Sequence, residues 1–443
     1  MSYAEVCLRE WDDLLPEKGS PLFQRFLDDP VSDVLASELN DRGVVGLTEL
    51  RQGLRITANS HVGSIRLGDL QLKVRPKITG MPLYRLLKYA YDLRDLKLLG
   101  RASHDLETSS FQDLLIHHLC AEGEELLRRG LNRDYLRLKG DLQFPRGRID
   151  LNRLAAQAGV SGGTLPCTYF SRTEDNRLNQ VLLAGLRLAL PLTSDTRLKA
   201  KLRQLCLILK EYVRPVELTE PLLLQVDRGL NRLQEHYRPA LKLIRILYES
   251  QGLSFSSRTA SLPFDGFFFD MNAFFQALLS RLLREHLEGF RIREEYKLHE
   301  SFAYAAGFNP RGRLTPKPRP DFAVLQGGQV VMLLDAKYRD LWEHSLPSSW
   351  LYQMTVYAAS GVGTGTAKVL YPSMSGRAKL QVIEVRNPVT GGRCAQVVLQ
   401  PVHLLRLATL LDQGLSGGQA AAEYVQELVF GMPSHGVRKL VKP

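Results

Sequence analysis

The stretch from Arg319 to Asp340, RPDFAVLQGGQVVMLLDAKYRD, has the pattern of a β-hairpin with charged residues near both ends. Two apolar runs flank the Gly327–Gly328 pair, and paired glycines between such runs are typical of a tight hairpin turn. The second run, VVMLL, is nearly continuous, as expected of a strand that is buried on both faces. The sequence therefore predicts two strands within a larger sheet, with acidic residues at the strand ends.

Strand geometry places the polar residues at these ends on one face. Asp335 and Lys337 are two residues apart and so point the same way, and Asp321 opens the neighbouring strand. Two converging carboxylates repel each other unless a cation lies between them, and hard oxygen ligands favour Mg²⁺ or, alternatively, Mn²⁺. Lys337 could orient or deprotonate a water and stabilise charge on a phosphorane-like transition state. We therefore predict phosphodiester hydrolysis, with Asp321 and Asp335 as metal ligands and Lys337 as the catalytic lysine.

A plainer interpretation is that two solvated strands simply end in charged residues, because Pro-Asp and Asp-x-Lys pairs also arise by chance in long chains. The apolar run VVMLL counts against it, since charges at the end of a core strand are expensive outside a functional site. Gln353 and Tyr357 add support: they lie one turn apart on the next expected helix and could hold DNA backbone or orient Lys337. For that pair, an ordinary half-buried helix face is the alternative.

The composition of the 443-residue chain indicates a globular protein with a polyanionic partner. Its net charge of +11 favours nucleic acid, and one basic cluster lies just upstream of the hairpin, at Arg311, Arg313, Lys317 and Arg319. No apolar run approaches the roughly 18 residues of a membrane helix. The start lacks a secretory pattern, and the five cysteines are scattered. We therefore expect a cytoplasmic protein without a membrane partner. Because GxxxxGK[ST] is absent, we expect the chain itself to bind no nucleotide.

The order of apolar patterns predicts a chain with several parts. Residues 62–78 read as a hairpin and residues 81–93 as a helix, whereas three long helical patterns follow between 110 and 250. Loops are expected at 140–154 and 159–176. The third region has the order helix, strand, strand, strand, helix, strand, which a mixed α/β sheet flanked by helices accommodates. The predicted domains are a β-rich domain at 1–98, a mostly helical domain at 99–250, an α/β domain at 251–400 and a helical tail at 401–443.

At these residues the chain resembles the PD-(D/E)xK nuclease superfamily, in the branch that carries QxxxY after the core. The matching residues are Pro320-Asp321, Asp335-Ala336-Lys337, and Gln353 with Tyr357. More specifically, the chain resembles the McrC family, the nuclease subunits of McrBC-type modification-dependent restriction systems. The stretches that carry this resemblance lie within roughly residues 40 to 375 and are VGSIRLGDLQLKVRPKI, RGRID, CTYFSRTEDNRLNQ and FDMNAFFQALLSRLL.

The resemblance implies a restriction-endonuclease-like sheet in the domain at 251–400 and an antiviral function. The chain would be an endonuclease subunit that cuts DNA carrying modified cytosine, with Mg²⁺. Its partner would be an McrB-like AAA+ GTPase hexamer that recognises the modified base and translocates. The domain at 1–98 would dock to this partner and stimulate its GTPase.

One residue departs from the superfamily pattern. A glutamate often lies on the helix before the first strand, and Gln276 occupies that position here. Its amide oxygen can still bind a metal or a metal-held water, but it supplies no charge. Glu294 and Glu295 are the candidates to compensate for it. Two alternatives to the restriction subunit stay open: a stand-alone DNA repair or processing nuclease, and a catalytically weakened adaptor that only activates a GTPase.

Overall fold

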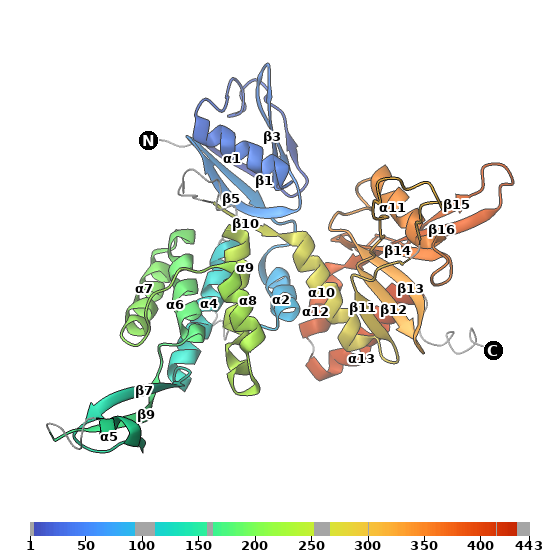
Figure 1. Cartoon of the computed structure of the whole chain (residues 1–443). Coiled ribbons are helices and arrows are strands. Elements are labelled where there is room, and N and C mark those ends of the chain that lie inside the picture. The colour runs from blue at the N-terminus through green and yellow to red at the C-terminus, as the bar shows by residue number, and fades with distance from the viewer. Residues whose placement is uncertain are drawn as a thin grey trace. The chain divides into compact units, whose positions relative to one another are not determined.

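The computed structural model describes residues 4–93, 111–156, 163–251, 266–299, 301–412 and 414–431. Its internal contacts divide the chain into two compact units (Figure 1). The first unit joins Met1–Phe111 to Phe268–Pro443, and the second is Gln112–Phe267. The first unit thus combines segments from both ends of the sequence. The domain boundaries at 98, 250 and 400 stay a prediction.

The N-terminal part of the first unit contains two small sheets and two helices. A four-stranded sheet has the order β1-β6-β5-β10 and a three-stranded sheet the order β2-β4-β3. The elements are β1 (Ala4–Arg9), β2 (Asp13–Leu14), α1 (Pro30–Asp41), β3 (Val45–Leu50), β4 (Gly53–Ala58), β5 (His61–Leu67), β6 (Leu70–Arg75), α2 (Gly80–Tyr91) and β10 (Gly266–Asp270). The predicted hairpin is confirmed as β5 and β6, and the turn between them includes Gly68 with φ +57°.

The C-terminal part of the first unit is built on a six-stranded mixed sheet. Its strand order is β11-β12-β13-β14-β16-β15. The elements are α10 (Met271–His286), β11 (Arg291–Glu294), β12 (Phe322–Gln326), β13 (Gln329–Ala336), α11 (Ser348–Ala359), β14 (Thr366–Ser373), β15 (Gln381–Arg386), β16 (Arg393–His403), α12 (Leu404–Asp412) and α13 (Gly414–Phe430). The expected order from helix α10 to strand β14 is confirmed, and β15 and β16 extend the sheet beyond it.

The quoted hairpin is the centre of this sheet. β12 pairs antiparallel with β13, which pairs in parallel with β14. Gly327 and Gly328 both have positive φ, +56° and +87°, as a tight two-residue hairpin turn requires. Helix α11 covers one face of the sheet, where Met354 and Tyr357 pack into a buried apolar cluster with residues of five strands. The carboxyl end of β13 is therefore held in place by strands and by a helix.

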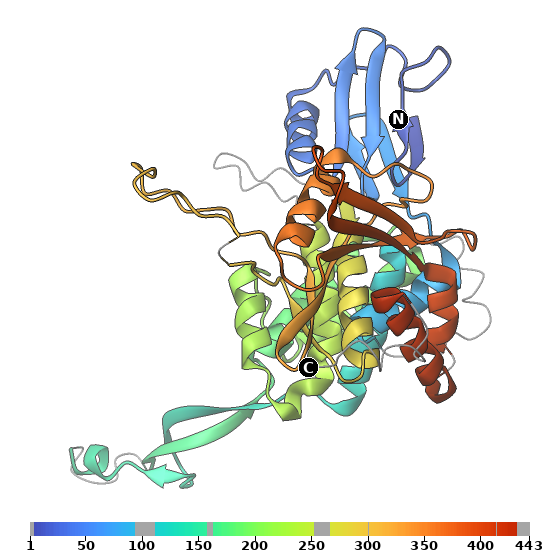
Figure 2. The same cartoon turned by 90° about the vertical axis from the view of Figure 1, so that its right-hand side faces the viewer.

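The second unit consists mainly of helices and carries one small sheet. Its elements are α4 (Phe111–Arg129), β7 (Asp134–Leu142), β8 (Arg148–Ile149), α5 (Leu151–Ala156), β9 (Leu165–Thr173), α6 (Arg177–Leu192), α7 (Thr196–Lys210), α8 (Glu220–Gly229), η1 (Arg232–Tyr237) and α9 (Arg238–Gln251). The expectation of loops at 140–154 and 159–176 is wrong in part, because β7, β9 and β8 form a sheet there. Figure 2 shows this ribbon extending away from the helices of its own unit. Leu136, Leu138 and Leu142 of β7 alternate with charged residues, but Gly140 interrupts the pattern and most of the strand is exposed.

Among the helices of the described ranges, none is both long and apolar enough to span a membrane.

Candidate functional site

The three predicted catalytic residues come together where β12 begins and β13 ends. Asp321 precedes β12, and its Oδ2 accepts a 2.7 Å hydrogen bond from the backbone N–H of Ala336 on β13. Nζ of Lys337 lies 2.9 Å from Oδ2 of Asp335. The antiparallel pairing of β12 and β13, with Phe322 opposite Leu334, brings these residues together. Strand alternation therefore predicted the cluster correctly.

Asp335 is the buried member of the cluster, whereas Asp321 and Lys337 are half-buried. Asp335 is only 1% exposed. The Lys337 side chain is 20% exposed, so it is the member of the ion pair that solvent can reach. Burial of Asp335 argues against the plainer interpretation of solvated strand ends, because removing an ionised carboxylate from water is costly unless other groups stabilise it.

Both carboxyl groups are shifted towards the protonated form. Burial and the nearby charge of Asp335 raise the pKa of Asp321 to about 6, although the Ala336 N–H and Lys337 act in the opposite direction. Burial also raises the pKa of Asp335, against the influence of Lys337. Two desolvated carboxylates with raised pKa values form a site that is short of positive charge, and a divalent cation would supply it.

The donor set around these carboxylates fits a hard cation. The Lys337 ammonium lies 2.9 Å from Oδ2 of Asp335, and this single positive charge faces two carboxylates. In the part of the chain that the structure describes, no three His, Cys, Asp or Glu residues gather as a metal site. Mg²⁺ suits such a sparse set, because it often keeps several waters and uses one or two carboxylates plus substrate phosphate.

Gln276 lies at the site, as its position on the helix suggested. From α10 its Nε2 donates a 3.3 Å hydrogen bond to Oδ1 of Asp321. The two glutamates considered as substitutes differ in their surroundings. Glu294 accepts a hydrogen bond from Ser280 and lies 2.6 Å from Arg284, whereas Glu295 pairs with Arg319 at 3.4 Å. Glu294 is therefore engaged by α10, and only Glu295 contributes to the field at Asp321, where its charge helps to raise the pKa.

The Gln353–Tyr357 pair lies on the face of α11 that covers the sheet. Gln353 Nε2 donates a 2.7 Å hydrogen bond to the Tyr357 hydroxyl, and Tyr357 is 2% exposed. Burial, aided by the charge of Asp335, raises the pKa of Tyr357 to about 12. The phenol therefore stays protonated at neutral pH, and it lies close enough for the charge of Asp335 to affect its pKa.

Trp350 is a site residue that the sequence analysis did not assign. It lies on α11 one turn before Gln353, and Nζ of Lys337 lies 5.4 Å from the centroid of its ring. A cation over an indole face is attracted by the ring quadrupole, which helps to fix the lysine. The spacing Trp350, Gln353, Tyr357 (i, i+3, i+7) was the available signal, because it puts all three residues on one helix face.

Two of three comparisons with known proteins find matches. The family model described as McrBC 5-methylcytosine restriction system component matches residues 56–372. Among solved structures, a chain of the refined half-complex from the tetradecameric assembly of Thermococcus gammatolerans McrB AAA+ hexamers with bound McrC is 18% identical, with a TM-score of 0.61. That likeness covers 95% of this chain and 100% of the other, and it shows a shared fold.

A chain of the cryo-EM structure of the Thermococcus gammatolerans McrBC complex is 21% identical, with a TM-score of 0.45. This likeness covers 66% of this chain and 90% of the other. The comparison with curated proteins finds no significant match.

Proposed function

The chain belongs to the family of McrBC 5-methylcytosine restriction system components, and from that premise we propose that it is the endonuclease subunit of a modified-cytosine-dependent restriction system. It would hydrolyse DNA phosphodiester bonds with Mg²⁺. The observation that carries this proposal is the cluster of Asp321, Asp335 and Lys337 around the buried Asp335 carboxylate at the end of a strand pair. Carboxylates whose pKa values are raised in this way weaken the fold at neutral pH, but they suit a metal-dependent reaction.

The sheet supports assignment to the PD-(D/E)xK nucleases. Pro320-Asp321 precedes β12, and Asp335-Ala336-Lys337 ends β13, so the sequence motif coincides with a hairpin of the mixed sheet. Helix α11 follows β13 and carries Gln353 and Tyr357 towards the same site. A chance motif would not be expected to meet all three conditions at once.

In the proposed reaction, Asp321 and Asp335 would hold Mg²⁺ through their carboxylate oxygens, and Gln276 adds an amide at the edge of the site. A cation there would supply polarisation of the scissile phosphate and a lower pKa of the attacking water. Lys337, the partly exposed member of its ion pair, orients that water and stabilises negative charge on the phosphate oxygens. Trp350 and the Gln353–Tyr357 pair keep this lysine and its surroundings in place.

A basic arm beside the site supports DNA as the substrate. Residues 301–320, SFAYAAGFNPRGRLTPKPRP, contain four cationic side chains and no acidic one. Figure 2 shows the segment between β11 and β12 extending away from the sheet, in yellow-orange. At its tip, Phe308 is 78% and Leu314 92% exposed. Exposed apolar side chains among arginines fit insertion into a DNA groove, where phosphates surround the apolar contacts.

The arm leads directly into the candidate site. At its base Leu298 N–H donates to Pro318 O at 2.9 Å, and Tyr296 N–H donates to Pro320 O at 3.1 Å. Near its tip Asn309 exchanges two 2.9 Å hydrogen bonds with the backbone of Arg313. Since Asp321 follows Pro320, the base of this arm lies directly beside the carboxylates. The arm can thus hold the backbone next to the bond that is cut.

A partner follows from the family. The Thermococcus gammatolerans half-complex contains McrB AAA+ hexamers with bound McrC. By analogy, we infer an McrB-like AAA+ GTPase hexamer that recognises modified cytosine, and docking through the N-terminal region that stimulates its GTPase. Phosphate contacts position a protein on DNA without reading its sequence, so base recognition would belong to the partner.

The decisive experiment measures cleavage of 5-methylcytosine-containing DNA with Mg²⁺, GTP and the AAA+ partner. Asp335→Ala should abolish cutting and leave stimulation of the partner's GTPase intact. Glu384→Ala is the matched control, because Glu384 lies on β15 of the same sheet with an exposed carboxylate paired to Arg386. Normal cutting by Asp335→Ala would contradict the site assignment.

The same assay separates the alternatives. Cutting of unmodified DNA without any nucleotide would favour a stand-alone nuclease. Stimulation of the GTPase by the wild-type chain without any cutting would favour the adaptor.

A further inference from the structure

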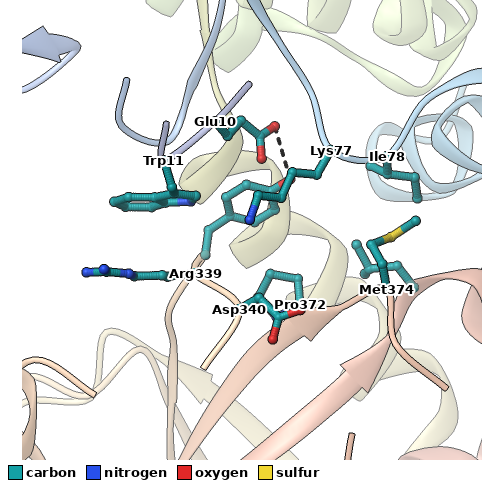
Figure 3. A pocket seen from close by; sticks show the side chains of 10 residues that line it. Glu10, Trp11, Lys77, Ile78, Arg339, Asp340, Pro372 and Met374 are labelled. Carbon is teal, nitrogen blue, oxygen red and sulfur yellow. Dashed lines mark hydrogen bonds between the residues drawn. The ribbon is translucent and has the colours of Figure 1, made fainter. Parts of the chain in front are cut away.

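The turn at Arg9–Asp12 lies against the chain segment that follows Lys337, within the first unit (Figure 3). The turn is closed by a 3.2 Å hydrogen bond from Asp12 N–H to Arg9 O, and Arg9 N–H donates to the Asp12 carboxylate at 2.8 Å. Trp11, the third residue of the turn, has φ +67°. This left-handed conformation normally belongs to Gly or Asn and is strained for a bulky residue. Surrounding contacts must therefore hold Trp11 in place.

Glu10 supplies the first contact. It is 1% exposed, and its Oε1 accepts a 3.3 Å hydrogen bond from the Tyr338 hydroxyl. Burial raises the pKa of Glu10 to about 8, although Tyr338 and Lys77 act in the opposite direction. A mainly neutral carboxyl group at pH 7 can accept this bond without a buried charge. The Tyr338 ring is itself fixed edge-on against Phe275 of α10, 5.8 Å between centroids.

Trp11 supplies the second contact. The Arg339 guanidinium carbon lies 5.3 Å from the centroid of the Trp11 ring, and Figure 3 shows the two side chains stacked. Nε of Arg339 is buried without a hydrogen-bond partner among the described residues, so the indole is a principal contact of this side chain. A further link joins Lys77, just after β6, to Glu343 at 3.8 Å.

The opposite side of the same segment is anchored to the sheet. Lys337 N–H donates to Leu370 O of β14 at 3.0 Å. Asp340 accepts hydrogen bonds from the Ser373 hydroxyl at 3.1 Å and from Trp342 N–H at 2.9 Å. The backbone on which Lys337 sits is thus held between β14 and the Glu10–Trp11 turn. Small displacements of a catalytic group reduce rates strongly, about 100-fold for 1 Å.

We propose that Glu10 and Trp11 are positioning residues for Lys337, and that the turn Arg9–Asp12 acts as a latch which holds the end of β13 in its reactive place. The inference rests on the proposed function for its catalytic consequence. Its structural part can be tested without cleavage. Through these contacts, residues of the N-terminal region affect the position of Lys337.

The first experiment measures hydrogen exchange of the full-length chain without partner or DNA. Glu10→Ala and Trp11→Gly should each speed exchange of the amides of residues 337–341 several-fold, and leave the amides of α13 unchanged. Trp11→Gly also relieves the left-handed backbone, so a loss of protection there reports the missing stack and not added strain. Glu5→Ala is the control, because Glu5 lies on β1, the strand that leads into the turn, but pairs with Lys73 on the surface. Unchanged exchange at 337–341 in both variants would overturn the latch.

The second experiment measures DNA cleavage with Mg²⁺, GTP and the partner. Glu10→Ala and Tyr338→Phe should each lower kcat about ten-fold with KM for DNA within two-fold, because the lysine is displaced and DNA contacts are kept. Glu10→Gln should restore kcat, since its amide oxygen can accept the tyrosine hydroxyl. The double variant Glu10→Ala/Tyr338→Phe should be no worse than either single change.

The two failures are distinguishable. Equal losses in Glu10→Gln and Glu10→Ala, or a change in KM alone, would contradict the positioning role. A wild-type chain that never cuts would contradict the proposed function, while hydrogen exchange would still decide on the latch.

Discussion

Two lysines on neighbouring strands of the same sheet have opposite surroundings. Lys337 ends β13 beside two carboxylates and is partly exposed. Lys368 on β14 pairs in register with Leu334 and therefore points to the opposite face from Asp335. It is 4% exposed, burial lowers its pKa to about 8, and its Nζ donates to Leu428 O at 3.3 Å. Lys337 belongs to the candidate site, whereas Lys368 donates a hydrogen bond to a carbonyl at the carboxyl end of helix α13.

The difference shows when a buried charge indicates function. Leu428 lies in the last turn of α13, where free carbonyls and the helix dipole favour a cation. Lys368 thus has a local structural role. Asp321 and Asp335 instead repel each other, and Lys337 can offset only one of the two charges. A buried charge therefore does not by itself indicate a functional site. It does so when the surrounding residues supply too little opposite charge to stabilise it.

The largest expected effect separates the two lysines directly. Lys337→Ala should lower the cleavage rate at least about 100-fold, the lower range for loss of a proton-transfer group. Lys368→Met should leave cleavage within two-fold, because it faces away from the carboxylates. Single-turnover cleavage by both variants checks this. A strong loss of cleavage in Lys368→Met would contradict the different roles assigned to the two lysines.

The next effect concerns the arm beside the carboxylates. Arg311→Ala/Arg313→Ala should weaken DNA binding and reduce the slope of log K against log salt by about 1.8, if each arginine neutralises one phosphate. Arg386→Ala/Arg393→Ala is the matched control, at the far edge of the sheet on β15 and β16. DNA binding titrated at several salt concentrations measures both. Equal slopes for the two double variants would contradict the proposal that the arm contacts DNA phosphates.

A third prediction tests whether the repulsion between Asp321 and Asp335 lowers the stability of the fold. The raised pKa of Asp321 means that the unfolded chain releases this proton first, so the folded state loses stability as pH rises from about 4 to about 6 and does not regain it above. With metals removed, Asp321→Asn should therefore be more stable at pH 7.5, on the order of 1–3 kcal/mol. Thermal unfolding measures this. Added Mg²⁺ should stabilise the wild type and not the variant.

The smallest effect belongs to Lys368. Its lowered pKa means that the unfolded chain holds the proton more tightly, so wild-type stability rises with pH between about 8 and 10.5. Lys368→Met should flatten this rise, by at most about 1.4 kcal/mol per pH unit. Denaturant unfolding at several pH values in this window measures the slope. An unchanged slope would contradict the assignment of Lys368 as a buried, weakly solvated ammonium.

Local sequence patterns predicted much of the fold. The β12–β13 hairpin, helix α10 with its apolar stripe, and helix α11 follow from strand alternation, paired glycines and helical spacing, which act between near neighbours. Asp270 caps α10 by accepting from the N–H groups of Asn272 and Ala273. Sheet β7-β9-β8 was missed because β7 and β9 pair across some 30 residues of chain, and no pattern between near neighbours predicts such a pairing.

The sequence by itself determined the nature of the site: two carboxylates and a lysine at strand ends can be brought to one face by alternation alone, because that rule needs only neighbouring residues. Only the tertiary structure decided how buried Asp335 is, that Gln276 reaches Asp321, and that Trp350 faces Lys337. It also decided the contact between Glu10 and Tyr338, which are 328 residues apart. Such contacts depend on packing between distant segments, and no local period in the sequence encodes them.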